Sequence, residues 1–212
     1  MKVALIGATG FVGTEILKEA VSRGYQVTAI ARNTDKVAKQ AGVIAVAADI
    51  NDADALAAII AGHDAVINSF NAGWANPNLY NDFLKGSADI QAAVKKAGVK
   101  RYLTIGGAGS LFIDGKQLVD SPQFPKEYYA GASAARDYLA QLHKEEELDW
   151  TFLSPAINLH PGERTGTFRL GTESPVFNDE GKNDISVADL AVAVINELEN
   201  NQFIKARFTL GY

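Results

Sequence analysis

Short, mostly apolar runs alternate along the chain with longer segments in which apolar residues recur every three or four positions. Such a run predicts a strand buried on both faces of a sheet, and a recurrence near 3.6 residues predicts an amphipathic helix. The alternation of the two predicts an α/β fold with a doubly wound parallel sheet. We expect strands at residues 3–6, 26–31, 43–47, 64–68, 101–105, 150–154 and 203–210, and helices at residues 11–23, 35–41, 53–61, 78–97, 128–145 and 186–199.

Three places fall outside this alternation. Residues 114–127 contain glycine, aspartate, serine and two prolines, and we expect an irregular rim or lid there. Residues 157–171 are predicted to form a loop and a hairpin. His63 follows the helix-ending Gly62 and is expected in a surface loop. In the last helix, Ser186 is the expected N-cap and Asp189 occupies the capping-box position.

Composition narrows the classes of partner. The chain has 212 residues, a formal net charge of −5 and no cysteine. An acidic chain without a basic stripe disfavours nucleic acid as a partner, and the lack of cysteine excludes disulfides and thiolate chemistry. No apolar stretch has the length of a membrane span, nothing resembles a signal peptide, and no metal-ligand cluster is found, so we expect a cytoplasmic location. We expect one domain over residues 1–212.

The first strand leads into a glycine-rich turn. Gly7, Gly10 and Gly13 follow the strand at spacings of three, and a helix opens at Phe11. A strand, a glycine turn and a helix N-terminus are the parts of a dinucleotide cradle, since backbone N–H groups and the helix dipole meet a pyrophosphate there. The context of the pattern favours nucleotide binding over a plain tight turn. The expected cofactor contacts in this turn are Gly7, Thr9, Gly10, Phe11, Val12 and Gly13.

The end of the second strand predicts the cofactor. NAD sites place a carboxylate there to hold the ribose 2′-hydroxyl, whereas NADP sites need a positive charge for the 2′-phosphate. This chain has Arg32, with Lys36 one turn further on, so the sequence predicts NADP(H). The alternative is that Arg32 is an ordinary solvated cation near Asp35.

Further cofactor and substrate contacts are expected where the next strands end. Asp49 can accept from an adenine amino group, with Ile50 against the ring, although Asp49 can equally be a helix-capping acid. Ser69, Phe70 and Asn71 follow the fourth strand at the switch point of the sheet, where ligands bind. Trp74 is expected either to stack on a planar substrate or to anchor its loop on the core.

The second half of the chain supplies candidates for the reaction itself. Ser110, in the glycine-rich loop after the fifth strand, is a catalytic candidate or a turn residue, and Pro155 is expected near the nicotinamide. His160 is a candidate proton source or a structural histidine. Arg164 is expected to hold an anionic substrate group or, equally, a carboxylate at the rim. We assign residues 1–150 to the cofactor-binding core and residues 151–212 to the substrate side.

One expected catalytic pair is missing. Ketone reductases of the short-chain type use a tyrosine with a lysine four residues later. Here Tyr128 is followed by Ala132, and no other tyrosine has the lysine either. A flavin or quinone accepts hydride into a conjugated ring and takes its proton from water, so such a site needs positioning above all.

Several motifs together resemble one family. The chain is similar to the atypical short-chain dehydrogenase/reductases, in the NADH-flavin reductase branch that also resembles biliverdin reductase B, over nearly its whole length. The resemblance implies a single extended Rossmann domain that uses NAD(P)H to reduce flavins or quinones without the Tyr-Lys pair. Tetrapyrrole reduction is not implied, because the substrate loops differ. The motifs that carry it are GATGFVG at 7–13, Ala31-Arg32-Asn33, Ser69-Phe70, IGGAGSL at 105–111, LSPA at 153–156, PGERTG at 161–166 and ISVADLAVA at 185–193.

These observations lead to two functional hypotheses. The first is an NADPH-dependent reductase that passes hydride to a planar small-molecule acceptor. The second is a non-catalytic NADP(H)-binding redox sensor, which the missing Tyr-Lys pair also allows. A nucleotide-sugar epimerase is disfavoured because that chemistry needs the tyrosine base. Helices 78–97 and 128–145 are candidates for pairing two copies into a homodimer.

Overall fold

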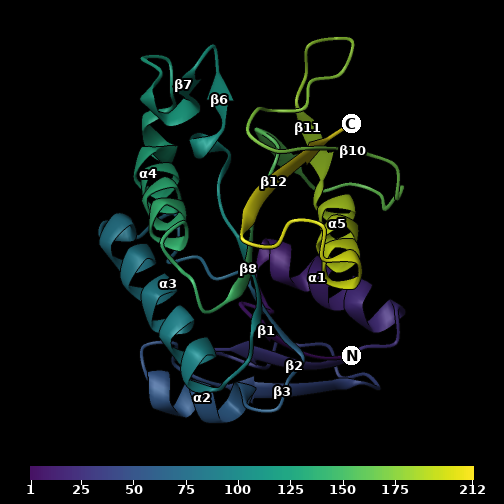
Figure 1. The fold of residues 1–212 in the computed structure, drawn as a ribbon. Helices are drawn as coiled ribbons and strands as arrows, with labels where there is room; N and C mark the ends of the chain where they lie inside the picture. The colour runs from purple at the N-terminus through teal and green to yellow at the C-terminus, as the bar shows by residue number, and fades with distance from the viewer.

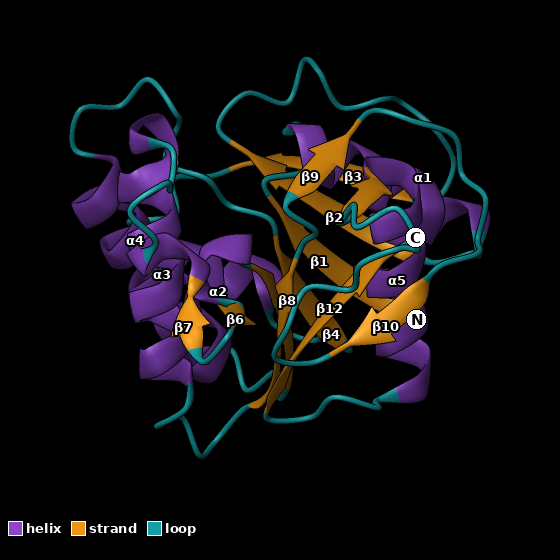
Figure 2. Ribbon diagram, turned by 90° about the horizontal axis from the view of Figure 1, so that it is seen from above, coloured by secondary structure: helices purple, strands orange, loops and turns teal.

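The computed structural model describes all residues, Met1–Tyr212, and its centre is an eight-stranded sheet. The strands lie in the order β10-β12-β8-β5-β4-β1-β2-β3 (Figures 1 and 2). Every neighbouring pair is parallel except β10 with β12. The strands of this sheet are β1 (Lys2–Ile6), β2 (Gln26–Ala31), β3 (Val43–Ala47), β4 (Ala65–Asn68), β5 (Arg101–Ile105), β8 (Asp149–Ser154), β10 (Arg169–Gly171) and β12 (Ala206–Gly211).

Helices cover both faces of the sheet, as Figure 2 shows. On one face, α1 and α5 pack together over apolar side chains of the central strands. On the other face, α2, α3 and α4 pack over a second apolar cluster that includes Tyr102, Tyr138 and Trp150. Burial on both faces explains why the strands read as nearly continuous apolar runs. The helices are α1 (Phe11–Ser22), α2 (Ala53–Ile60), α3 (Leu79–Lys96), α4 (Lys126–Leu142) and α5 (Val187–Asn200).

The order of the strands places the switch point. The chain runs from β1 to β2 and β3 on one side, and then returns to β4 on the other side of β1. Ligands of doubly wound sheets bind beyond the carboxyl ends of the strands at such a reversal. The glycine turn after β1 and the loop after β4 therefore meet at the position where a nucleotide is expected. The predicted doubly wound α/β fold is confirmed.

Two small sheets stand above the carboxyl ends of the strands. The first is the hairpin of β6 (Phe112–Ile113) and β7 (Lys116–Gln117), which forms part of the expected rim (Figure 1). The second pairs β9 (Asn158–His160) with β11 (Asp184–Ser186) in parallel. The predicted hairpin at 157–171 is therefore wrong: β9 pairs in parallel with β11, and β10 adds to the edge of the main sheet beside β12. Short 3-10 turns at Ala108–Ser110 and Leu118–Asp120 complete the rim.

Three local expectations are corrected. The helix predicted at 35–41 is absent, and the segment forms a turn in which the Asp35 N–H bonds to the side chain of Asn33. Seven residues with one buried apolar side chain, Val37, bury too little surface to hold a helix. His63 is buried rather than exposed. Burial is possible because both ring nitrogens have hydrogen-bond partners inside the protein, Thr28 Oγ1 and the Ile60 carbonyl oxygen, each at 2.8 Å. Burial lowers the pKa of the His63 imidazole.

The last helix and strand also refine the prediction. Ser186 is the N-cap of α5, as expected, and its hydroxyl accepts the Asp189 N–H at 3.0 Å. Asp189 does not return the bond of a capping box, because its carboxylate is engaged elsewhere. The final strand begins at Ala206 rather than at residue 203. None of the five helices combines the length and the apolarity that crossing a lipid bilayer requires.

Candidate functional site

The backbone contacts that close the glycine turn after β1 leave no room for a side chain. Gly7 has φ +79°, and its N–H bonds to the Ile30 carbonyl oxygen at the end of β2. A Cβ on Gly13 would lie 2.1 Å from the Gly7 carbonyl oxygen, so only glycine lets α1 approach β1 this closely. A Cβ on Gly7 would lie 2.7 Å from the Ser69 carbonyl oxygen. The structure therefore joins the predicted turn to the start of the switch-point loop.

The N-terminus of α1 lies directly above this turn. Its N-cap is Gly10, which supplies no side-chain acceptor, and the first turn carries no acidic residue. The first N–H groups of the helix are thus left to bind an anion, as in dinucleotide sites. Phe11 is half exposed beside them, while Thr9 and Val12 are partly buried. A cofactor pyrophosphate fits these residues.

Ser69 and Phe70 reach the same place from β4. Ser69 donates its hydroxyl to the Ile6 carbonyl oxygen at 2.8 Å, which ties the ends of β4 and β1 together. Phe70 packs with Ile50 over Gly86 of α3, where a Cβ would lie 2.6 Å from the Phe70 ring and 2.9 Å from Ile50. Two predicted cofactor contacts therefore lie side by side, on a glycine that the sequence alone did not single out.

Arg32 stands free at the end of β2. Its side chain is exposed and makes neither a hydrogen bond nor an ion pair with Asp35 or any other residue. Asp49 lies near enough for Arg32 to contribute to the lowered pKa of its carboxyl, although hydrogen bonds from Asn51 are the main cause. Asp49 is not the cap of α2, because Asp52 accepts the Ala55 N–H in that role. Both Arg32 and Asp49 remain available to a nucleotide.

Trp74 and Asn71 lie at the other side of the switch-point loop. Asn71 accepts the Gly73 N–H at 2.7 Å, which shapes the loop. Trp74 is 59% exposed, packs over Gly131 of α4, and meets the ring of Tyr128 edge to face with centroids 5.5 Å apart. Tyr128 is itself 51% exposed. The pair is anchored on α4 at one edge and open to solvent at the other, so Trp74 anchors its loop, and its stacking on a substrate stays a prediction.

Ser110, the predicted catalytic candidate, has a side chain that is closed off from solvent. Its exposed fraction is 0%, and Arg207 of β12 donates to its carbonyl oxygen at 2.7 Å and to its hydroxyl oxygen at 3.1 Å. A buried guanidinium needs acceptors, and the Ser110 loop supplies them. Ser110 therefore holds Arg207 in this conformation and does not face an open site. Pro155 follows the end of β8 and is partly buried.

His160 and Arg164 are also engaged with the protein. The two ring nitrogens of His160 lie 2.9 Å from the Pro161 carbonyl oxygen and 3.6 Å from an Asp184 carboxylate oxygen, which corresponds to the structural alternative. Arg164 makes a two-pronged ion pair with Glu19 of α1, at 2.7 and 2.9 Å. The expectation that Arg164 holds a substrate anion is corrected: Arg164 pairs with a carboxylate, as in the alternative, but that carboxylate belongs to the buried Glu19 of α1 and not to the rim.

A polar network pins the PGERTG segment to both helices of its face. Glu19 is buried and also accepts from Arg23, and hydrogen bonding from Arg164 is the main reason that the pKa of its carboxyl is lowered. Asp189 of α5 accepts the Thr165 hydroxyl and the Gly166 N–H. The motif is therefore a clasp between α1 and α5. Sequence reasoning missed Glu19, because an acidic residue within an amphipathic helix looks like any solvated one.

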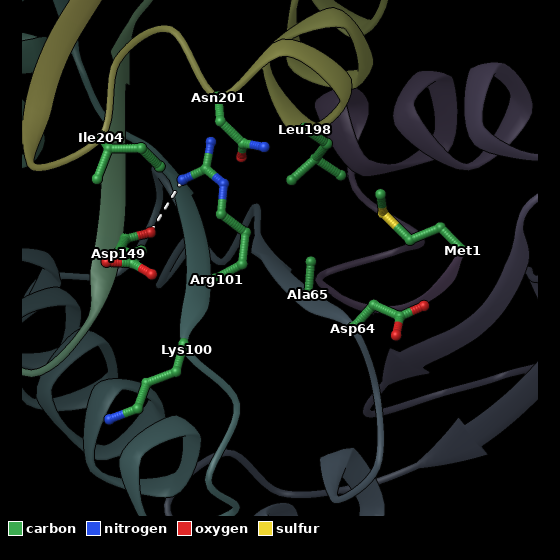
Figure 3. Close-up of a pocket in the computed structure, with 9 residues that line it drawn as sticks. All are labelled: Met1, Asp64, Ala65, Lys100, Arg101, Asp149, Leu198, Asn201 and Ile204. Atoms are coloured by element: carbon green, nitrogen blue, oxygen red, sulfur yellow. Dashed lines mark hydrogen bonds between the residues drawn. The ribbon is translucent and has the colours of Figure 1, made fainter.

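One hollow of the molecule lies away from these residues. It has a volume of about 470 Å³ and lies at the amino ends of the strands, with Arg101 extending across it (Figure 3). Arg101 donates to the Asp149 carbonyl oxygen at 2.9 Å and to Glu197 at 2.7 Å, so its charge is neutralised. None of the predicted cofactor residues lines this hollow. The expected cofactor position is therefore defined by the glycine turn and not by this hollow.

Comparison with known proteins identifies relatives over the whole chain. Residues 7–201 match the model of a family described as NAD(P)H-binding. An uncharacterised protein, YwnB, of Bacillus subtilis is 41% identical over 99% of this chain and 98% of its own length. The crystal structure of a putative epimerase from Bacteroides thetaiotaomicron has a TM-score of 0.93 and 43% identity, covering 100% of this chain and 96% of that one. A putative NADH-flavin reductase from Streptococcus pneumoniae has a TM-score of 0.86 and 35% identity, covering 100% and 99%.

Proposed function

This chain belongs to the NAD(P)H-binding family of Rossmann-fold proteins, and from that premise we propose that it is an NADPH-dependent reductase that passes hydride to a planar acceptor such as a flavin or a quinone. The observation that carries the proposal is the pairing of an uncapped α1 N-terminus over the Gly7–Gly13 contact with a free cation, Arg32, at the end of β2. The first binds a pyrophosphate, and the second binds a 2′-phosphate. The similarity to the putative NADH-flavin reductase from Streptococcus pneumoniae supports the acceptor class.

The residues of the site fit this cofactor at each end. Gly13 lets α1 pack directly against Gly7, and Gly10 at the N-cap has no side chain to keep a diphosphate away from the backbone. Ile50 and Phe70, packed over Gly86, offer an apolar surface to the adenine ring. Arg32 makes no ion pair or hydrogen bond with any carboxylate of the chain, which leaves its guanidinium donors for the additional phosphate.

When bound, the nicotinamide supplies a hydride, and the chain's own residues bind and orient the partner that receives it. Trp74 and Tyr128 present aromatic surface at the carboxyl side of the sheet, where a flat ring can stack. Tyr138 of α4 is excluded as a proton donor. It is fully buried against Tyr102, and burial raises the pKa of its phenol well above 10. The arrangement favours orientation of two rings over acid catalysis by a side chain.

The acceptor class is tested by turnover. Purified protein is mixed with NADPH and, in turn, FMN, FAD, riboflavin or a benzoquinone, and the nicotinamide absorbance is followed. We expect an acceptor-dependent loss of absorbance with at least one of them. If NADPH binds tightly and none of these acceptors is reduced, the reductase is excluded. The result then favours the second candidate, a non-catalytic NADP(H) sensor, which the missing Tyr-Lys pair also allows.

The choice of cofactor is tested by Arg32→Asp. Loss of a charged hydrogen bond to phosphate and the added repulsion should weaken NADPH binding by roughly 10 to 100-fold while NADH binding stays within a few-fold. Calorimetric titration with both coenzymes measures the ratio. Lys39→Asp, an exposed site in the following turn, is the matched control for the change in net charge. An unchanged ratio in Arg32→Asp removes the assignment.

A further inference from the structure

Arg207 is a buried cation that the proposed reaction does not use. It lies on β12 with a side chain only 2% exposed, and its guanidinium lies 5.7 Å from the centre of the Phe112 ring. One terminal nitrogen donates to Ser110, and the other is paired with Glu173. A charge removed from water to this extent needs compensation, so the identity of its counterion matters.

The counterion is much less buried than the cation. The Glu173 side chain is 60% exposed and belongs to the loop after β10, whereas Arg207 is fixed within the sheet. The loop is attached to the β6 end through the Phe112 N–H, which donates to the Glu173 carbonyl oxygen at 2.8 Å. An exposed carboxylate on a loop exchanges with another anion at low cost, because water solvates it once it leaves. Arg207 has no such freedom.

Two buried polar atoms beside this pair have no partner. They are the Nε of Arg207 and the hydroxyl oxygen of Thr209, both with side chains at least nine-tenths buried. Residues two apart on a strand project from the same face, so both belong to one side of β12. Thr209 is in register with Ser154, the last residue of β8. Arg207 is in register with Phe152, two residues before that end, and its side chain reaches the Ser110 loop. Unused donors next to a fixed cation are the features of an anion site that is incompletely filled.

The surroundings place this position at the acceptor side. Ser110, which Arg207 contacts, belongs to the loop after β5, and the β6–β7 hairpin and the loop after β10 rise from either side of it (Figure 1). These are the segments outside the nucleotide-binding turn that stand above the carboxyl ends of the strands. An acceptor that lies over a nicotinamide held by the glycine turn extends toward them.

We propose that Arg207 recognises an anionic group of the acceptor, a phosphate or a carboxylate, and that Glu173 occupies this position until the acceptor displaces it. This inference rests on the proposed function for the nature of the acceptor. It makes Arg207 the residue that selects among planar acceptors by charge, with Thr209 as an additional donor. The expected acceptors are thereby narrowed to molecules that combine a flat ring with an anionic group.

FMN and riboflavin provide a matched pair of probes, since they share the ring system and differ in the phosphate. We expect the protein loaded with NADP⁺, which has no hydride to donate and leaves the flavin oxidised, to bind FMN roughly tenfold more tightly than riboflavin, as one charge-assisted contact allows. Glu173→Gln removes the competing carboxylate and should tighten FMN binding at least about threefold without changing riboflavin binding. Arg207→Met should abolish the preference. Glu180→Gln, on the same loop and paired only with Lys182, is the control.

Calorimetry of binding keeps the two proposals separate, because it requires no turnover. If no acceptor is reduced but the FMN preference responds to Glu173→Gln as stated, the reductase fails and the anion site stands. If flavins are reduced and Glu173→Gln leaves the FMN to riboflavin ratio of affinities unchanged, the anion site is overturned. A lower melting temperature of Glu173→Gln with that unchanged ratio also overturns it, since the pair then only holds the loop. Arg207→Met is not needed for either conclusion should it fail to fold.

Discussion

The nucleotide end and the acceptor end of this molecule are built by different means. At the nucleotide end, Gly7 and Gly13 let the backbones of β1, α1 and the Ser69 loop approach more closely than side chains allow. At the acceptor end, charged side chains from distant segments hold the loops, as in Arg164 with Glu19 and Arg207 with Ser110. The contact between Gly7 and Gly13 is local in sequence, and the Ser69 loop joins it from the end of β4, whereas the pairs of the second kind span 145 and 97 residues.

The difference has a physical consequence for how each end tolerates change. A closely packed backbone has no room to relax, so an added methyl group must displace a strand or a helix. The ion pairs at the acceptor end are partly solvated, and the loss of one contact leaves the others in place. The nucleotide end is therefore expected to be rigid and intolerant, and the acceptor end adjustable.

The sharpest test of this contrast is Gly13→Ala. The new methyl group would lie 2.1 Å from the Gly7 carbonyl oxygen, so α1 must move away from β1. We expect the free energy of unfolding to fall by about 2–3 kcal/mol and NADPH affinity to drop by more than about tenfold. Gly107→Ala is the control at the acceptor end, where the added Cβ meets the Ala135 Cβ at an ordinary 3.4 Å. Equal effects of the two substitutions on urea denaturation would remove the contrast.

The clasp is tested by Asp189→Asn and by acid. Burial raises the pKa of this carboxyl, but hydrogen bonds from Thr165, Tyr212 and Gly166 outweigh burial and leave the pKa below 3.8. Because the folded pKa lies below the unfolded one, the stabilisation is complete above pH 4–5 or thereabouts and is lost as the pH falls through the folded value. We expect Asp189→Asn to cost about 2 kcal/mol at pH 7.

The same variant should also flatten the loss of stability in acid. Between about pH 5 and pH 2, the unfolding free energy of the wild type should fall more steeply than that of Asp189→Asn. Asp179→Asn, an exposed change on the loop before β11, serves as the control and should follow the wild type. Parallel profiles for all three proteins would show that the Asp189 carboxylate does not stabilise the acceptor end.

The smallest expected effect is that of Trp74→Ala. The indole is 59% exposed and packs on Gly131 with one edge, so its removal should cost less than about 1 kcal/mol of stability. If Trp74 stacks on the acceptor, the KM for FMN should rise roughly three to tenfold while NADPH affinity stays the same. Trp74→Phe should keep the KM for FMN close to that of the wild type. An unchanged KM in Trp74→Ala would identify Trp74 as a loop anchor only.

The sequence predicted the nucleotide end well and the acceptor end poorly. The strand positions, the glycine turn and the end of β2 follow from local patterns. The structure brings Ser69 to the glycine turn and Phe70 beside Ile50, and their contacts with a cofactor stay a prediction. Arg164 and Ser110 have different partners from those expected, because nothing near them in the chain indicates Glu19 or Arg207. One signal was present: Arg207 interrupts a strand that the sheet buries on both faces.

The sequence by itself determined the alternation of strands and helices, the switch point and the kind of cofactor cradle, because apolar periodicity and glycine spacing act within a few residues. Only the tertiary structure decided that His63 is buried and that Arg164 is paired. It also decided that Arg207 lies behind Ser110 with Glu173 as its exposed counterion. Those outcomes depend on which distant side chains reach a desolvated charge, and a charge inside a protein takes its partner from the fold rather than from its neighbours in the chain.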